Sequence, residues 1–217
     1  AELALASAQQ AAAEDGRVVR AARLARVHNM AEFIVDGTFG RSSGGPSGTR
    51  DHSVDTYLYS RPLAYNYRVF GHWHNAAATF SGATVRRDRA GAGLEYRSTL
   101  FSASAEFSHA LNDGENGVAA SIVWTPNDHW TLRAGADTSA NETPLQARRS
   151  GINARRQAGE IIWQASESRS AALGYAQMDF SDGNKRDVTQ ARWTERVIVG
   201  PVYKLEVTAA VYTSRNS

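Results

Sequence analysis

The chain has 217 residues, of which 42% are hydrophobic and 21% charged, and its net charge is only +2. The length suits one domain, or one domain with an appendage, and the balanced charge argues against a nucleic-acid partner. No stretch approaches the roughly 20 consecutive apolar residues of a membrane helix, so a bilayer crossing would require a closed β-barrel. Cysteine is absent, which is compatible with an oxidising periplasm or cell surface.

The first 29 residues predict a short helical segment. Residues 1 to about 10 are rich in alanine, Asp15-Gly16 is a turn signal, and residues 17–28 place apolar side chains at helical spacing. This helix–turn–helix pattern resembles one unit of a repeat such as the tetratricopeptide, although a single pair shows no period. We therefore expect a helical segment at 1–29 and a second domain at 30–217.

From about Ala31 the hydrophobic period changes to two, which is typical of β-strands. The pattern predicts eleven strands, at residues 32–39, 51–59, 65–75, 83–97, 99–109, 117–125, 129–138, 152–166, 169–180, 187–199 and 203–213. Alternation alone leaves open whether the polar face points inward, as in a membrane barrel, or outward, as in a soluble one. The low share of bulky aliphatic residues favours a thin lipid-facing band over a filled core.

Connections between the predicted strands alternate in length. One set is short and lies near residues 62, 97–98, 125–128, 166–168 and 200–201. The other set tends to be longer and lies at residues 41–50, 75–82, 111–117, 139–153 and 181–186. An up-and-down membrane barrel has this parity, because its periplasmic turns are short and its outer loops are longer.

Tryptophans support the same interpretation. Trp124 and Trp130 flank one short turn, and Trp163 lies just before another, so all three are expected at the periplasmic level. Belts of Trp and Tyr are found at membrane interfaces. The alternative is that these residues are ordinary core aromatics.

The number and the end of the strands bear on closure. Bacterial single-chain barrels close with an even number of strands, whereas eleven is odd. The chain also ends in a polar segment, residues 212–217, instead of a strand with a terminal aromatic residue. We therefore expect an all-β, antiparallel up-and-down transmembrane barrel that is incomplete at its C-terminus.

Few side-chain groups suggest chemistry. His72 and His74 share one strand face at a spacing that binds metals, but no third ligand is evident, and we interpret them as polar residues near the rim. Serines and histidines such as His109 and His129 occur without a Gly-x-Ser-x-Gly frame. We therefore expect no catalytic residues, no metal and no cofactor.

Charged residues on the polar faces are the better candidates. Alternation turns four glutamates and four arginines inward, namely Glu95, Glu106, Glu160 and Glu206 with Arg89, Arg133, Arg192 and Arg196. Carboxylates along a channel favour a cationic or hydroxyl-rich chain, so the glutamates are our candidate substrate path. The alternative is a lumen of paired charges that only stiffens the barrel.

Several segments resemble the barrel of export porins for poly-β-1,6-N-acetyl-D-glucosamine, the PgaA or HmsH type. They run in order over nearly all of residues 27–217. The segments are Val27-His-Asn-Met-Ala-Glu-Phe33, Gly40-Arg-Ser-Ser-Gly44, Leu58-Tyr-Ser-Arg-Pro62, Arg68-Val-Phe70, Ala92-Gly-Leu-Glu-Tyr-Arg97, Asn127-Asp-His-Trp130, Thr143-Pro-Leu-Gln-Ala147, Met178-Asp-Phe-Ser-Asp-Gly-Asn184, Trp193-Thr-Glu-Arg196 and Tyr212-Thr-Ser-Arg-Asn216.

The resemblance implies a periplasmic tetratricopeptide domain followed by an outer-membrane barrel of about sixteen strands. It implies export of partly deacetylated polymer for biofilm matrix through an electronegative lumen, with a periplasmic deacetylase and outer-membrane lipid as partners, and no enzymatic activity. Two alternatives remain, a barrel enzyme acting on lipid and a structural or adhesive barrel without transport.

Overall fold

A computed structural model describes residues 2–41, 50–80 and 83–217. The N-terminal segment forms two helices, α1 (Glu2–Ala11) and α2 (Gly16–His28). Asp15 caps α2, because its carboxylate accepts a hydrogen bond of 2.8 Å from the Arg17 backbone N–H. A second hydrogen bond, from the Arg17 side chain, lowers the pKa of Asp15. The helix–turn–helix expected from the sequence is therefore confirmed.

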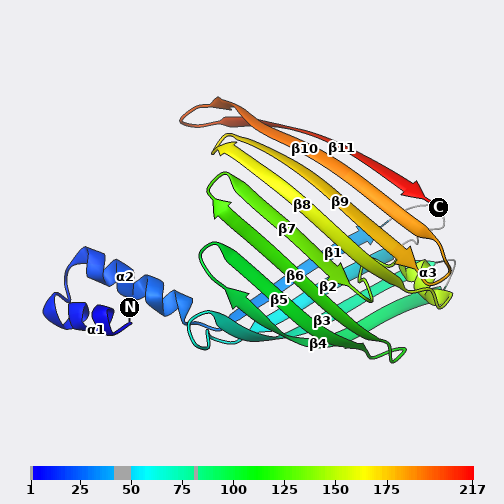
Figure 1. Cartoon of the computed structure of the whole chain (residues 1–217), viewed down its shortest axis with the longest axis horizontal. Coiled ribbons are helices and arrows are strands. Elements are labelled where there is room, and N and C mark those ends of the chain that lie inside the picture. Colours follow the sequence, from blue (N-terminus) through cyan, green and yellow to red (C-terminus); the bar gives the residue numbers. More distant parts are fainter. Residues whose placement is uncertain (1, 42–49, 81–82) are drawn as a thin grey trace.

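The remaining chain forms one antiparallel sheet of eleven strands, as predicted. In chain order these are β1 (Glu32–Arg41), β2 (Arg50–Tyr59), β3 (Tyr67–Phe80), β4 (Ala83–Arg97), β5 (Phe101–Ala110), β6 (Asn116–Asn127), β7 (Trp130–Asp137), β8 (Ala154–Ser166), β9 (Arg169–Phe180), β10 (Lys185–Val199) and β11 (Lys204–Asn216). Each strand pairs with its sequence neighbours, so β1 and β11 are the two edges of an open sheet. Figure 1 shows that this up-and-down sheet curves into a trough.

The two ends of the trough, where the strands begin and end, carry different connections. Helices α1 and α2 lie at the same end as the turns at 128–129 and 167–168 (Figure 1). The opposite end carries the longest described connection, residues 138–153, which contains a helix that the sequence did not predict, α3 (Leu145–Arg149). No helix among the described residues has the length and apolar character needed to span a membrane.

Connection lengths agree with the predicted parity between β4 and β10 and depart from it toward both edges of the sheet, where the connection at 200–203 is as long as the one at 181–184. The expected outer loop at 75–82 is mostly strand, because β3 continues to Phe80 and pairs with β4. The expected short turn near Pro62 extends over residues 60–66. Residues 42–49, most of the expected loop at 41–50, lie outside the described part of the chain.

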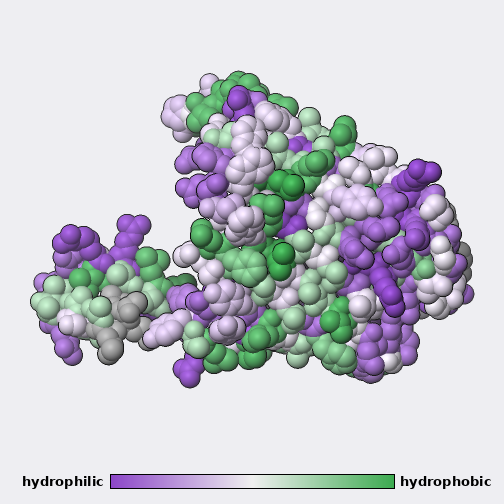
Figure 2. All heavy atoms as spheres, in the orientation of Figure 1, coloured by the Kyte–Doolittle hydropathy of each residue, from purple (hydrophilic) through white to green (hydrophobic). Residues whose placement is uncertain are grey.

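The exposure of the side chains shows which face of the sheet is the outer one, a question that alternation left open. One face carries large apolar side chains that stay exposed, such as Phe107 (57%) and Leu173 (57%). The other face carries charged residues that are buried, such as Arg89 (3%). A water-soluble sheet would bury the first face, whereas a membrane barrel exposes it to lipid. In Figure 2 hydrophilic residues gather at the end of the trough that carries α3.

Four of the five tryptophans form a row on the apolar outer face. Trp130 pairs with Trp163, and Ala171 pairs with both Trp163 and Trp193. Trp124 lies two residues further along, opposite Leu132. The common level of Trp124, Trp130 and Trp163 is thus confirmed, and Trp193 is an addition that the sequence analysis missed. Such a row matches the aromatic girdle of membrane barrels.

Residues 138–153, hereafter the inner segment, fold back across the polar inner face. They connect β7 to β8, yet α3 lies against β3 and β4. Ala140 is fully buried and packs in a small cluster with Ala154, Met178 and the partly buried Phe180. The described buried core therefore sits inside the trough, between the inner segment and the strands.

Candidate functional site

The polar inner face is the candidate site, and it contains all the charged residues that alternation turned inward. Cross-strand pairing links Glu95 with Arg68, Arg133 with Glu160, and Arg196 with Glu206. The same pairing places Arg89, Glu106 and Arg192 on this face as well. The predicted orientation of the four glutamates is therefore correct, while their role in a substrate path is a separate question.

Two of the four glutamates are buried in ion pairs. The Glu95 side chain is 11% exposed, and its Oε2 lies 2.9 Å from Arg97 Nε. Arg97 also approaches Glu32, which accepts a 2.8 Å hydrogen bond from Arg68. These charges neutralise one another, so Glu95 presents little free negative charge to the lumen.

Glu106 belongs to a buried network around two histidines. His72 Nδ1 lies 2.8 Å from Glu106 Oε1 and His72 Nε2 lies 2.9 Å from Asp55 Oδ1. His74 Nδ1 lies 2.8 Å from the same Asp55 oxygen. Carboxylates only accept hydrogen bonds, so a protonated His72 donates to both and carries its charge between them.

The interpretation of the two histidines as rim residues is therefore wrong. His72 and His74 lie in the middle of β3 and are 8% and 2% exposed, and their hydrogen-bond partners Asp55 and Glu106 come from β2 and β5 on the inner face. No local pattern signals the burial of the two histidines, since their partners are distant in the chain. Within the described residues, no group of three or more His, Cys, Asp or Glu side chains is arranged to hold a metal.

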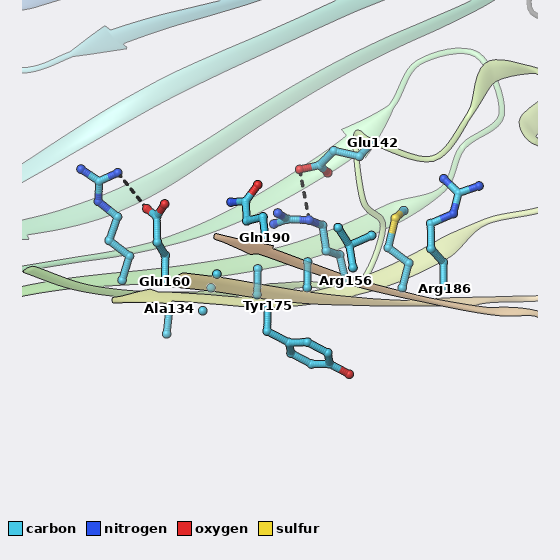
Figure 3. A pocket seen from close by; sticks show the side chains of 15 residues that line it. Ala134, Glu142, Arg156, Glu160, Tyr175, Arg186 and Gln190 are labelled. Carbon is cyan, nitrogen blue, oxygen red and sulfur yellow. Dashed lines mark hydrogen bonds and ion pairs between the residues drawn. The ribbon is translucent and has the colours of Figure 1, made fainter. Parts of the chain in front are cut away.

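Glu160 lies beside a hollow of about 480 Å³ on the inner wall of β7–β10. Its Oε2 is 3.4 Å from Arg133 Nη1 and its Oε1 is 4.0 Å from Arg192 Nη2. Figure 3 shows Glu160, Gln190, Arg156 and Arg186 on one side of the sheet, with Tyr175 on the other.

Small inner-face residues make room for this hollow. Gly135, Ala158, Gly174 and Ala176 lie in the wall between the long polar side chains. Glu142, from the inner segment, reaches the hollow from above and lies 3.4 Å from Arg156 Nε (Figure 3). The hollow therefore presents several hydrogen-bond donors and acceptors around open space.

Glu206 is the most exposed of the four glutamates. Its side chain is 53% exposed on the edge strand β11, and its Oε2 lies 3.9 Å from Arg196 Nη2. At that distance and exposure the pair is weakly held. Glu206 therefore offers accessible carboxylate. Glu160, which is 21% exposed and paired more loosely with two arginines, borders the hollow, whereas Glu95 and Glu106 are enclosed within the wall.

Aromatic residues on the inner face are a feature that the sequence analysis missed. Tyr57 stacks on His72 with ring centroids 4.0 Å apart, and Tyr59 packs on Phe70 at 5.2 Å. Alternation along β2 and β3 gives the signal for them, because Asp55, Tyr57 and Tyr59 share a face. The inner face thus combines ring surfaces with paired charges, an arrangement suited to hydroxyl-rich, partly apolar ligands such as sugars.

Comparison with known proteins shows which family and which solved structure this architecture resembles. The family model described as the PgaA membrane beta barrel domain matches residues 27–217. A solved "Bacterial polysaccharide outer membrane secretin" superposes with a TM-score of 0.76 at 26% identity, over 88% of this chain and 64% of that one. The outer-membrane location expected from the sequence agrees with both.

Two curated relatives carry the name "Poly-beta-1,6-N-acetyl-D-glucosamine export protein", from Escherichia coli (strain K12) and Escherichia coli O157:H7. Each is 30% identical over 208 residues, which cover 94% of this chain and 26% of the relative. The chain thus spans about a quarter of the length of these relatives. The resemblance found in the sequence is confirmed, and the chain belongs to the PgaA membrane β-barrel family.

Proposed function

We propose that this chain forms part of the wall of an outer-membrane pore that exports poly-β-1,6-N-acetyl-D-glucosamine for biofilm matrix. The observation that carries the proposal is the division of the same eleven strands into an exposed apolar outer face and a polar inner face. Lipid requires the first face, and a water-filled lumen requires the second. The substrate follows from the names of the two E. coli relatives.

The inner face suits a long, hydroxyl-bearing polymer. Its guanidinium and carboxylate groups are held in pairs, so they offer many hydrogen bonds without one deep charged site. A translocating chain needs such weak and repeated contacts, because tight binding at one point would stop its movement. This favours transport over catalysis, and we assign no residue a catalytic role.

Within the path, we assign Glu160 and Glu206 the contacts with free amines of a partly deacetylated polymer. Glu206 is about half exposed, and Glu160 borders the hollow with its two arginines at the longer distances of 3.4 and 4.0 Å. Glu95 and Glu106 stabilise the wall through their pairs with Arg97 and His72. They affect the polymer only through the shape of the wall. The original set of four thus divides into two contact residues and two wall residues.

The proposal extends to the surroundings of the barrel. Outer-membrane lipid would contact the apolar face, and the end with α1 and α2 would face the periplasm. Helices at that end suit a tetratricopeptide domain that receives polymer from a periplasmic deacetylase. The support is the position of the helix pair at the end with short turns (Figure 1).

Bilayer recordings on the full-length protein test the proposal. We expect ion conductance that glucosamine oligomers reduce, with a block that depends on voltage because the oligomer is cationic. Maltose oligomers of equal length are the control, since they are neutral. Conductance that is indifferent to glucosamine oligomers would contradict the substrate, and a protein without conductance would contradict the pore.

A further inference from the structure

We propose that the inner segment, residues 138–153, is a built-in constriction of the lumen that an arginine clamp on β4 holds in place. The inference rests on the proposed pore function only for its effect on flow. The position of the segment and its attachment are properties of the fold itself.

The path of the segment is the first argument. Strands β7 and β8 are neighbours, so a short loop outside the barrel would be enough to join them. Instead the connection runs inward until α3 meets β3 and β4, several strands away along the wall. Because it contacts residues of the inner face, it occupies space that the lumen would otherwise have.

Two arginines of β4 form the clamp. Arg87 donates hydrogen bonds of 2.7 Å to the Ala140 carbonyl and 3.2 Å to the Ser139 carbonyl. Arg89 donates to the Ser139 carbonyl and, at 3.1 Å, to Asn141 Oδ1. Ser139 is 1% exposed as a result. Backbone carbonyls are the main acceptors, so the clamp fixes the path of the segment itself.

Further polar contacts hold the rest of the segment. Arg148 of α3 pairs with Asp113 and Glu115 in the connection from β5 to β6, and Glu142 pairs with Arg156 of β8. Apolar packing is slight by comparison, since Ala140 is the segment's member of the buried cluster. An attachment made mainly of hydrogen bonds and ion pairs is released when its arginines are removed.

A single cysteine reports directly on this attachment, because the natural chain contains none. Ser139→Cys places a thiol under the clamp, and Asp182→Cys places one in the exposed connection from β9 to β10 as a control. We expect a membrane-impermeant thiol reagent to modify Cys at 139 at least about tenfold more slowly than at 182 in the full-length protein. Adding Arg87→Ala and Arg89→Ala should remove most of that difference.

The matched control is Arg133→Ala with Arg192→Ala. These arginines also lie on the inner face, but their acidic partner is Glu160 and not the inner segment. They should leave the thiol at 139 protected. Equal protection with and without the β4 arginines, in protein whose folded form still migrates faster on unheated gels, would overturn the clamp.

Conductance tests the constriction separately. Replacing residues 141–151 by a short Gly-Ser linker should raise single-channel conductance by at least about 1.5-fold, because conductance follows the narrowest cross-section. An unchanged conductance in the folded deletion variant would overturn the constriction. If the unaltered protein shows no conductance, the pore proposal fails, yet the thiol experiment still decides whether the segment is clamped.

Discussion

Glu106 illustrates how a carboxylate on the inner face can be enclosed by partners from the wall itself. It is one of two carboxylates that flank the His72 ring. Removing it leaves a buried ring nitrogen without a partner, and an unsatisfied buried group costs roughly 1–3 kcal/mol. The residue therefore contributes to the stability of the wall.

The Glu106→Ala variant should accordingly unfold at lower denaturant concentration in detergent, with a loss of about 1–3 kcal/mol. Glu206→Ala is the control, because its carboxylate is about half exposed and its one ion pair is long. Equal stability of the two variants would show that the His72 network does not support the fold.

Gly93 is a second residue whose role depends on its neighbours. A Cβ atom at this position would lie 2.3 Å from Phe70 Cζ and 2.4 Å from the Ala105 carbonyl oxygen. The glycine therefore allows Phe70 to lie across β4 on the inner face, a cross-strand arrangement of aromatic and glycine.

We expect Gly93→Ala to destabilise the barrel by about 1–3 kcal/mol, the usual cost of overpacking. Gly71→Ala is the matched variant, since no atom lies within 4 Å of its added Cβ. The melting temperature in detergent measures both. If Gly93→Ala were as stable as Gly71→Ala, Phe70 and the backbone at Ala105 would be able to move away from the added methyl group at little cost.

At the scale of one element, β6 has neighbouring residues whose side chains face opposite sides of the sheet. Ile122 points to the outer face and Ser121 to the inner face, where its hydroxyl lies 2.8 Å from that of Ser104. The two residues lie at nearly the same depth, so they differ in the environment that each side chain meets.

Ile122→Arg should therefore destabilise the folded barrel by up to about 2–4 kcal/mol, because arginine would face hydrocarbon. Ser121→Arg should be tolerated, since its side chain extends into the polar lumen. Folding into lipid vesicles, followed by the shift between folded and unfolded gel bands, compares them. If Ser121→Arg impaired folding more than Ile122→Arg, the assignment of the outer and inner faces would be reversed.

For the molecule as a whole, the charge pairs decide which carboxylates of the inner face are enclosed and which are more open. Glu206 is about half exposed and Glu160 borders the hollow, while Glu95 and Glu106 are enclosed. The electronegative lumen implied by the family resemblance stays a prediction, and in this wall Glu95, Glu160 and Glu206 are each paired with arginine.

Neutralising the more open pair, with Glu160→Gln and Glu206→Gln in the full-length protein, should weaken block by glucosamine oligomers about two- to fivefold. Block by fully acetylated oligomers should stay the same, because they carry no amine charge. If block by both kinds of oligomer weakened equally, the glutamates would affect the shape of the path and would not interact with the amine charge.

The sequence alone determined the eleven strands, the helix pair and which residues share a face, because each depends on local periodicity and turn residues. Alternation also placed Glu95 and Glu160 on one polar face, and the flanking of a turn by Trp124 and Trp130 indicated the level of these two tryptophans. These features repeat along the chain and need no knowledge of distant contacts.

Only the tertiary structure decided what those side chains meet. The burial of His72 between Asp55 and Glu106, and the inward path of residues 138–153 to Arg87 and Arg89, join positions that are far apart in sequence. The extension of β3 to Phe80 likewise follows from its pairing with β4. Strand identity is encoded locally, but burial, charge pairing and the filling of the lumen depend on which strands the curved sheet brings together.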